Sequence, residues 1–194
     1  MKKSIIVAGA ASVALAAMPI VGAFAAVEGV RDVVNATVGA GCSILNNSGD
    51  ATATNTVSIA ATADEVSTSS VSDSGYAGIS VVCNSNDWTI SAVGSGAGSE
   101  KTSLYSGANE IETGTATSGE DSAWAFRIAN MSVSDGVSAG SYADFSEIPA
   151  VATAVVTGTK SAAVTVKPQY QIFVAADQAA GTYTGAVTYT VAAN

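Results

Sequence analysis

The chain has 194 residues, with 16 acidic and 7 basic side chains, no histidine and a formal net charge of −9. The absence of histidine excludes Ser-His-Asp and Cys-His catalytic machinery and histidine-ligated metals, and so few basic residues exclude a nucleic-acid-binding surface. Apolar residues make up 48% of the chain and charged residues only 12%, which is typical of a globular protein and not of a disordered acidic chain.

The N-terminus has the layout of a secretory signal peptide. Lys2 and Lys3 precede an apolar run from Ile5 to Phe24, which ends in the A-x-A sequence of residues 23–25. We expect cleavage after residue 25, with an uncleaved membrane anchor as the alternative. Cleavage would leave residues 26–194 as a single domain with five basic and 16 acidic residues, a formal net charge of −11. The sequence therefore predicts an exported protein, secreted or on the cell surface, with no membrane segment after cleavage.

Two cysteines, Cys42 and Cys83, lie 41 positions apart. An even number of cysteines in an exported chain predicts a disulfide, which in the chain-entropy model stabilises the fold by roughly 3–4 kcal/mol. Two buried thiols or a metal-binding pair are the alternatives, but two cysteines without histidine do not complete a zinc site. We expect the bond to be structural, because the chain has no C-x-x-C spacing.

Apolar residues recur with a period of two along most of the chain, which predicts short β-strands with one buried face. Both cysteines lie in phase with the apolar positions of their segments. Residues 62–70 are the one segment where we expect a helical turn. The alternating segments predict an antiparallel β-sandwich of about eight strands, and they are Val34–Ile44, Val57–Ala61, Ile79–Cys83, Trp88–Ala92, Trp124–Ile128, Ala162–Val166, Tyr170–Val174 and Val187–Val191.

Polar stretches rich in glycine and serine separate these segments. The last two strands predict a hairpin, with Gly181 taking a positive φ near the turn. Residues 94–103, 113–122 and 132–141 predict loops, and they are interpreted as solvated connections or as contact loops on a rigid scaffold. The oxygen-bearing residues at 84–87 predict a turn rather than a cation site.

Two carboxylates, Glu110 and Glu112, flank Ile111 and so share one face of a predicted strand. Such a pair is what a glycosidase uses, but charges on strands also protect a sheet edge from pairing, and we favour that interpretation. The chain has no nucleophile elbow, phosphate loop or calcium-binding loop. We therefore expect a protein that is not an enzyme and holds no cofactor or metal.

Aromatic residues are the remaining candidates for binding. Trp88 and Trp124 are in phase with inward-facing aliphatic residues, so we expect both in the core, with stacking on a sugar as the alternative. Tyr76, Tyr105 and Tyr142 lie among glycines and serines. They are the candidates for exposed aromatic contacts.

Three stretches carry a family resemblance: TVGAGCSI at 37–44, ISVVCNSNDWTI at 79–90 and the segment 170–191. They resemble secreted bacterial surface proteins with pilin-like or immunoglobulin-like sandwiches, in particular the chaperone–usher pilin and spore-coat-U-like group. Members of that group carry a cysteine on the first strand, a second about forty residues later, and a closing strand like GTYTGAVTYTV at 181–191. The WTI sequence at 88–90 is similar to part of the cell-wall-binding WxL domains, and the 122–124 and C-terminal patterns resemble surface proteins of reduced-genome bacteria.

This resemblance implies an immunoglobulin-like or pilin-like fold and a structural or adhesive role at the cell surface. The expected partners are other surface-protein subunits or glycans of a host or cell wall. A carbohydrate- or cell-wall-binding module that uses loop aromatics is the second hypothesis, and a secreted hydrolase is the third.

Overall fold

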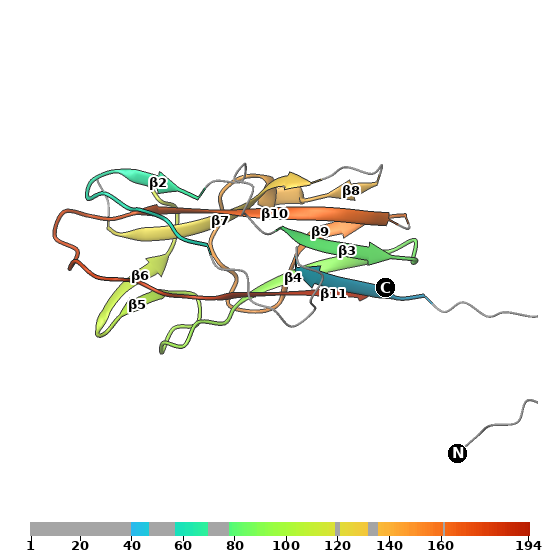
Figure 1. Ribbon diagram of the computed structural model, residues 1–194, viewed down its shortest axis with the longest axis horizontal. Coiled ribbons are helices and arrows are strands. Elements are labelled where there is room, and N and C mark those ends of the chain that lie inside the picture. Colours follow the sequence, from blue (N-terminus) through green and yellow to red (C-terminus); the bar gives the residue numbers. More distant parts are fainter. Residues whose placement is uncertain (1–39, 47–56, 70–77, 119–120, 132–135, 161) are drawn as a thin grey trace, which may run out of the picture. The chain divides into compact units, whose positions relative to one another are not determined.

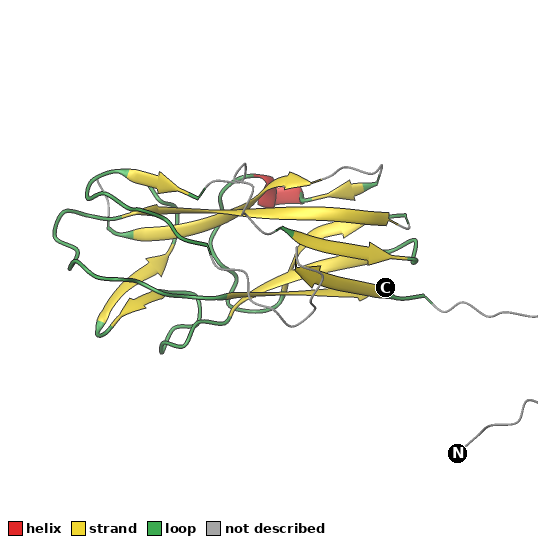
Figure 2. Ribbon diagram, in the orientation of Figure 1, coloured by secondary structure: helices red, strands yellow, loops and turns green. Residues whose placement is uncertain are grey.

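Strands make up most of the structure, a computed structural model that describes residues 40–46, 57–69, 78–118, 121–131, 136–160 and 162–194. These residues belong to one compact unit, Val38–Asn194. Within the described residues the helical content is a single 3₁₀ turn, η1 (Gly140–Ala143), drawn in red in Figure 2. The predicted signal peptide, residues 1–25, lies outside the described residues.

Seven strands form the larger sheet, and six of them follow the order β1-β3-β10-β7-β6-β5. The seventh, β2, pairs with residues 171–173 of β10, whereas β3 pairs with residues 162–166. Every ladder in this sheet is antiparallel except the short parallel pairing of β6 with β7. Its strands are β1 (Cys42–Asn46), β2 (Val66–Thr68), β3 (Ile79–Cys83), β5 (Leu104–Ser106), β6 (Asn109–Thr113), β7 (Ala123–Met131) and β10 (Ala162–Phe173).

Four strands form the second sheet, in the order β11-β4-β9-β8. All its ladders are antiparallel. The strands are β4 (Trp88–Gly94), β8 (Val137–Ser138), β9 (Thr153–Gly158) and β11 (Val187–Ala193). Figure 1 shows β10 and β7 in one layer and β4 and β11 in the other.

One hydrophobic core lies between the two sheets. Strand β4 shows the expected alternation, with every second residue from Trp88 to Gly94 buried, and β3 buries Ile79, Val81 and Cys83. Trp88 and Phe126, from opposite sheets, have no exposed surface at all. The prediction that Trp88 and Trp124 belong to the core is confirmed, because Trp124 is only 5% exposed.

Strand β10 replaces two of the predicted strands. The alternation predicts two separate strands, Ala162–Val166 and Tyr170–Val174, with residues 167–169 between them. The chain instead continues through one 12-residue strand whose register against β7 shifts between Lys167 and Pro168. A bulge accommodates a proline that cannot donate to the ladder, so Pro168 does not end the strand.

The predicted C-terminal hairpin is wrong. Strand β10 pairs with β2, β3 and β7, whereas β11 pairs with β4 in the other sheet. Residues 174–186 cross between the sheets, and Gly181 is not among the residues with positive φ. An alternating pattern shows which residues face inward but does not show which sheet the strand joins.

The predictions for two short segments are also wrong. Residues 57–62 form no strand, although Val57–Ala61 alternate. The expected helical turn over residues 62–70 is a tight turn, closed by the amide of Glu65 donating to the carbonyl of Thr62, and it leads into strand β2. The β-branched Val66 and Thr68 favour a strand there, and pairing with β10 holds it.

Candidate functional site

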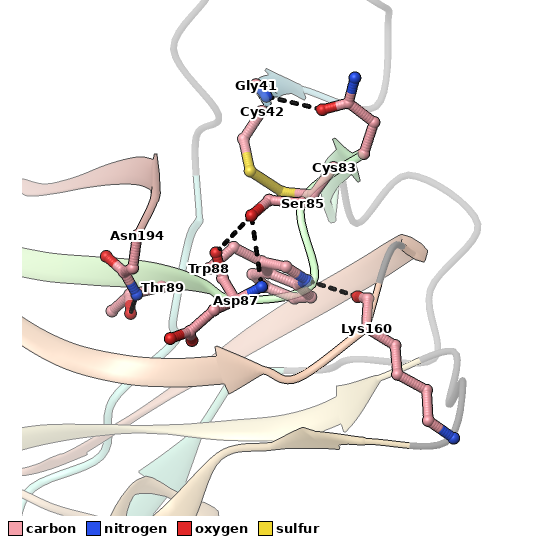
Figure 3. The surroundings of a disulfide bond; sticks show 10 residues. Gly41, Cys42, Cys83, Ser85, Asp87, Trp88, Thr89, Lys160 and Asn194 are labelled. Atoms are coloured by element: carbon pink, nitrogen blue, oxygen red, sulfur yellow. Dashed lines mark hydrogen bonds between the residues drawn. A yellow bond between two sulfur atoms is a disulfide. The ribbon is translucent and has the colours of Figure 1, made fainter. Parts of the chain in front are cut away.

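The disulfide joins neighbouring strands of the larger sheet. Cys42 on β1 lies directly opposite Cys83 on β3, with a Cα–Cα distance of 4.2 Å. Figure 3 shows the bond between Cys42 and Cys83 with Gly41 next to it. Gly41 N donates to Asn84 Oδ1 at 2.6 Å. Asn84 N in turn donates to Gly41 O at 3.1 Å. The first strand is therefore fixed to β3 by the disulfide and by the residues next to it.

The predicted turn at residues 84–87 carries the chain from one sheet to the other. Ser85 Oγ donates to the carbonyl of Asp87 at 2.8 Å and accepts from its amide at 3.3 Å. The chain then enters β4 with Trp88, whose indole Nε1 donates to the carbonyl of Lys160 at 2.9 Å (Figure 3). The hydroxyl of Ser85 closes this turn, which agrees with the turn predicted here.

The three candidate tyrosines have different surroundings. Tyr76 lies outside the described residues. Tyr142, in η1, is half-buried, and its ring lies 5.2 Å from the ring of Phe126, centroid to centroid. Tyr142 therefore packs on the core and has only part of its ring available for contact.

Tyr105 lies on β5, between two partner segments. On one side it is directly opposite Glu110 of β6. On the other, its backbone exchanges hydrogen bonds with Thr184, at 3.0 and 2.9 Å. Tyr105 is half-buried, and Gly98 lies so close to its ring that any side chain at residue 98 would overlap it.

The Tyr105 hydroxyl is the centre of a small polar network. It donates to Glu110 Oε1 at 2.7 Å and accepts from the amide of Glu100 at 3.0 Å. Its oxygen is also 3.1 Å from Ser99 Oγ. These contacts hold the phenol in one position, so Tyr105 presents a fixed surface rather than a freely rotating ring.

A hollow of about 540 Å³ opens beside this network. Its polar wall comes from Ser99, Tyr105, Glu110 and Thr184, and small residues fill the rest of the lining. This volume is within the range of about 300–1,000 Å³ that is usual for small-molecule sites. The hollow is the candidate binding site of the described domain, and it includes one of the predicted tyrosines, Tyr105.

The interpretation of the two carboxylates as guards of a sheet edge is wrong. Strand β6, which carries Glu110 and Glu112, lies between β5 and β7, so it is not an edge strand. Ile111 between them is buried, as the alternation predicts, and Glu110 is half-buried against Tyr105. Glu110 therefore helps to build the hollow, while Glu112 is exposed.

A second cluster of side chains contacts the backbone of Glu110. Gln178 Nε2 donates to the Tyr183 hydroxyl at 2.7 Å and lies 3.3 Å from the carbonyl of Glu110. The Tyr183 hydroxyl donates to the carbonyl of Ala179. The 174–186 connection is therefore tied to β6 by its own side chains. Sequence reasoning missed Ser99 and Thr184. Ser99 reaches the Tyr105 hydroxyl through the fold of the loop before β5, and Thr184 reaches Tyr105 through an isolated bridge.

In the part of the chain that the structure describes, no three Asp, Glu or Cys side chains gather closely enough to hold a metal ion. The described residues also include no helix that is both long and apolar enough to cross a membrane. Comparison with protein-family models and with curated proteins finds no match. What the protein does must therefore be argued from its own residues.

Proposed function

We propose that this is an exported, non-enzymatic structural or adhesive protein of the cell surface, whose two sheets form an immunoglobulin-like, pilin-like subunit. The disulfide supports export, because such bonds form and persist in oxidising compartments. The signal-peptide pattern of residues 1–25 supports it independently.

The main support for a structural role is that two edge strands of the sheets lack protection against pairing with another chain. Strands β5 and β8 end their sheets and are only three and two residues long. Strands β1 and β11 end the sheets at the other side with five and seven residues. Neither contains a charged residue or proline, the usual protections against pairing with another chain.

The inward-facing side chains of these two edge strands are also incompletely covered. Val187, Tyr189 and Val191 of β11 pack on the core but are only half-buried, unlike the fully buried row of the adjacent β4. Among the described strands, β11 pairs only with β4. A second copy that lies along its other edge would cover that apolar surface and pair the backbone groups there. These features support association of subunits through β11.

Size-exclusion chromatography and electron microscopy of the secreted, processed protein test this role. We expect concentration-dependent oligomers or filaments in the wild type and their loss in Thr190→Lys, which adds a charge to exposed β11. Thr157→Lys is the matched control, because Thr157 is exposed on β9, which has partners on both sides. A monodisperse monomer at high concentration would contradict the proposal, as would assembly unchanged by Thr190→Lys.

A binding module for glycans is the second candidate function. The hollow beside Tyr105 favours it, since an aromatic ring, a carboxylate and hydroxyl groups converge there without any basic side chain. The two candidates are compatible, because an adhesive subunit needs both a way to assemble and a surface that binds.

A further inference from the structure

We propose that the hollow beside Tyr105 binds one residue of a neutral glycan. The inference rests on the proposed adhesive role and names the site and the ligand class for it. The strand register is the starting observation. Residues directly opposite each other in antiparallel strands point to the same face. Glu110, Tyr105 and Thr184 are such neighbours, so they form a row along one wall.

The row is held in place before any ligand arrives. The backbone of Tyr105 is bonded on both sides, its ring packs against Gly98, and its hydroxyl has three polar neighbours. A site whose groups are already fixed loses little conformational entropy when it binds. The glycine at residue 98 is what allows the ring to lie against the loop.

Polar atoms remain free to meet a ligand. Glu110 uses only Oε1 in its bond with Tyr105, and within the described residues neither Glu110 Oε2 nor Thr184 Oγ1 has a hydrogen-bond partner. A carboxylate oxygen accepts and a hydroxyl both donates and accepts. Adjacent hydroxyls of a sugar also donate and accept, so they match this mixed set.

The charge of the lining separates a neutral sugar from other ligands. No lysine or arginine lines the hollow, and Glu110 supplies a negative charge, which disfavours sialic and uronic acids. A single ammonium group would contact the carboxylate alone and would leave the hydroxyl groups of the lining unused. Ala97, Gly107 and Ala108 add no bulky side chain to the lining.

The experiment measures binding of the full secreted chain to a panel of immobilised neutral hexose and N-acetylhexosamine oligosaccharides, with sialylated and uronic-acid oligosaccharides and polylysine beside them. We expect binding to some neutral members only. Glu110→Gln and Thr184→Val should each raise the half-saturation concentration about tenfold. Thr182→Val is the control, because Thr182 is exposed on the same connection and does not line the hollow.

Each result decides between the alternatives, provided that circular dichroism shows every variant to be folded. Neutral-glycan binding that both substitutions weaken and Thr182→Val preserves supports the site. No binding by the folded wild type, or binding that neither substitution changes, overturns it. Binding to polylysine that depends on Glu110 would show a cation site and overturn the sugar assignment. Assembly seen by electron microscopy tests the structural role separately, since it does not depend on Glu110 or Thr184.

Discussion

Tyr170 and Tyr189 join the two sheets through their side chains. Tyr170 lies on β10 and Tyr189 on β11, and their hydroxyl oxygens are 3.0 Å apart. Tyr170 also stacks near Trp124, at 6.1 Å between ring centroids. Strands β10 and β11, which the sequence predicted to form a hairpin, therefore have no backbone pairing with each other. They contact each other across the core through these two side chains.

We predict that this pair makes the protein less stable in alkaline solution. Burial raises the pKa of the Tyr170 phenol above its ordinary value of 10.0, an effect that outweighs the opposing influence of the Tyr189 hydrogen bond. Because the raised pKa belongs to the folded state, the stabilisation is complete below the unfolded pKa. It is lost as the pH rises through the folded pKa. Urea midpoints measured between pH 8 and pH 11.5 should fall above pH 10.

Tyr170→Phe tests the cause of that fall. The variant cannot ionise at residue 170, so its urea midpoint should decline less steeply above pH 10 than that of the wild type. Tyr142→Phe, which removes a phenol from η1 instead, should keep the wild-type decline. An equally steep decline in Tyr170→Phe would contradict the assignment.

The disulfide gives a second prediction. Cys42→Ala combined with Cys83→Ala should lower the free energy of unfolding by about 4 kcal/mol, since the bond closes a 41-residue separation. Addition of a reductant to the wild type should give a similar loss in a urea titration. If reduction leaves the midpoint unchanged, the bond does not stabilise the fold as proposed.

Local alternation predicted the strands well where one face of the strand is buried. The segments at 79–83 and 88–92 were predicted with both their bounds and their buried faces nearly correct, because every second residue of each is apolar. The pattern predicted two strands where β10 is one, because a bulge lets the strand continue through Pro168. Pairing between strands could not be read from the pattern, and this is why the hairpin was wrong.

The residues of the hollow could also be predicted only in part, because contacts between distant segments leave no local pattern in the sequence. Tyr105 was a candidate because it lies between glycine- and serine-rich stretches, a local signal that the sequence does carry. Thr184, 79 positions later, joins it only through an isolated bridge. Contacts of this kind depend on the path of the 174–186 connection, for which neither composition nor periodicity gives a signal.

A buried glutamine gives a third prediction. Gln169 on β10 is 9% exposed, its Oε1 accepts from Arg127 Nε at 2.8 Å, and its Nε2 donates to the carbonyl of Ser69 at 2.8 Å. Gln169→Leu removes the hydrogen bonds to Arg127 and to the carbonyl of Ser69. The substitution should lower the free energy of unfolding by about 1–3 kcal/mol. Urea denaturation measures this cost. Gln171→Leu, two residues along the same strand, is the control and should cost less, and equal costs would contradict the role of the network.

Hydrogen exchange can locate the effect of that substitution. The Gln169 bond to Ser69 joins the residue after β2 to β10, and Ser69 Oγ accepts from the amide of Tyr170 at 2.9 Å. Amides of β2 should therefore exchange faster in Gln169→Leu, while those of β4 and β11 in the other sheet keep their wild-type rates. Uniformly faster exchange in both sheets would indicate global destabilisation instead.

The last prediction concerns Gly158, which lies directly opposite Trp88 in the β4–β9 ladder. A Cβ at residue 158 would overlap the buried indole, whose position is also fixed by its bond to the carbonyl of Lys160. Gly158→Ala should therefore destabilise the fold by about 1–3 kcal/mol, whereas Gly41→Ala, which meets no atom within 4 Å, should have little effect. In a Trp88→Phe background the smaller ring leaves room for the methyl group, so Gly158→Ala should cost less there. Thermal and urea unfolding of the wild type, the two single variants Gly158→Ala and Trp88→Phe, and the double variant give this coupling. Costs that simply add would show that the ring does not set the requirement for glycine.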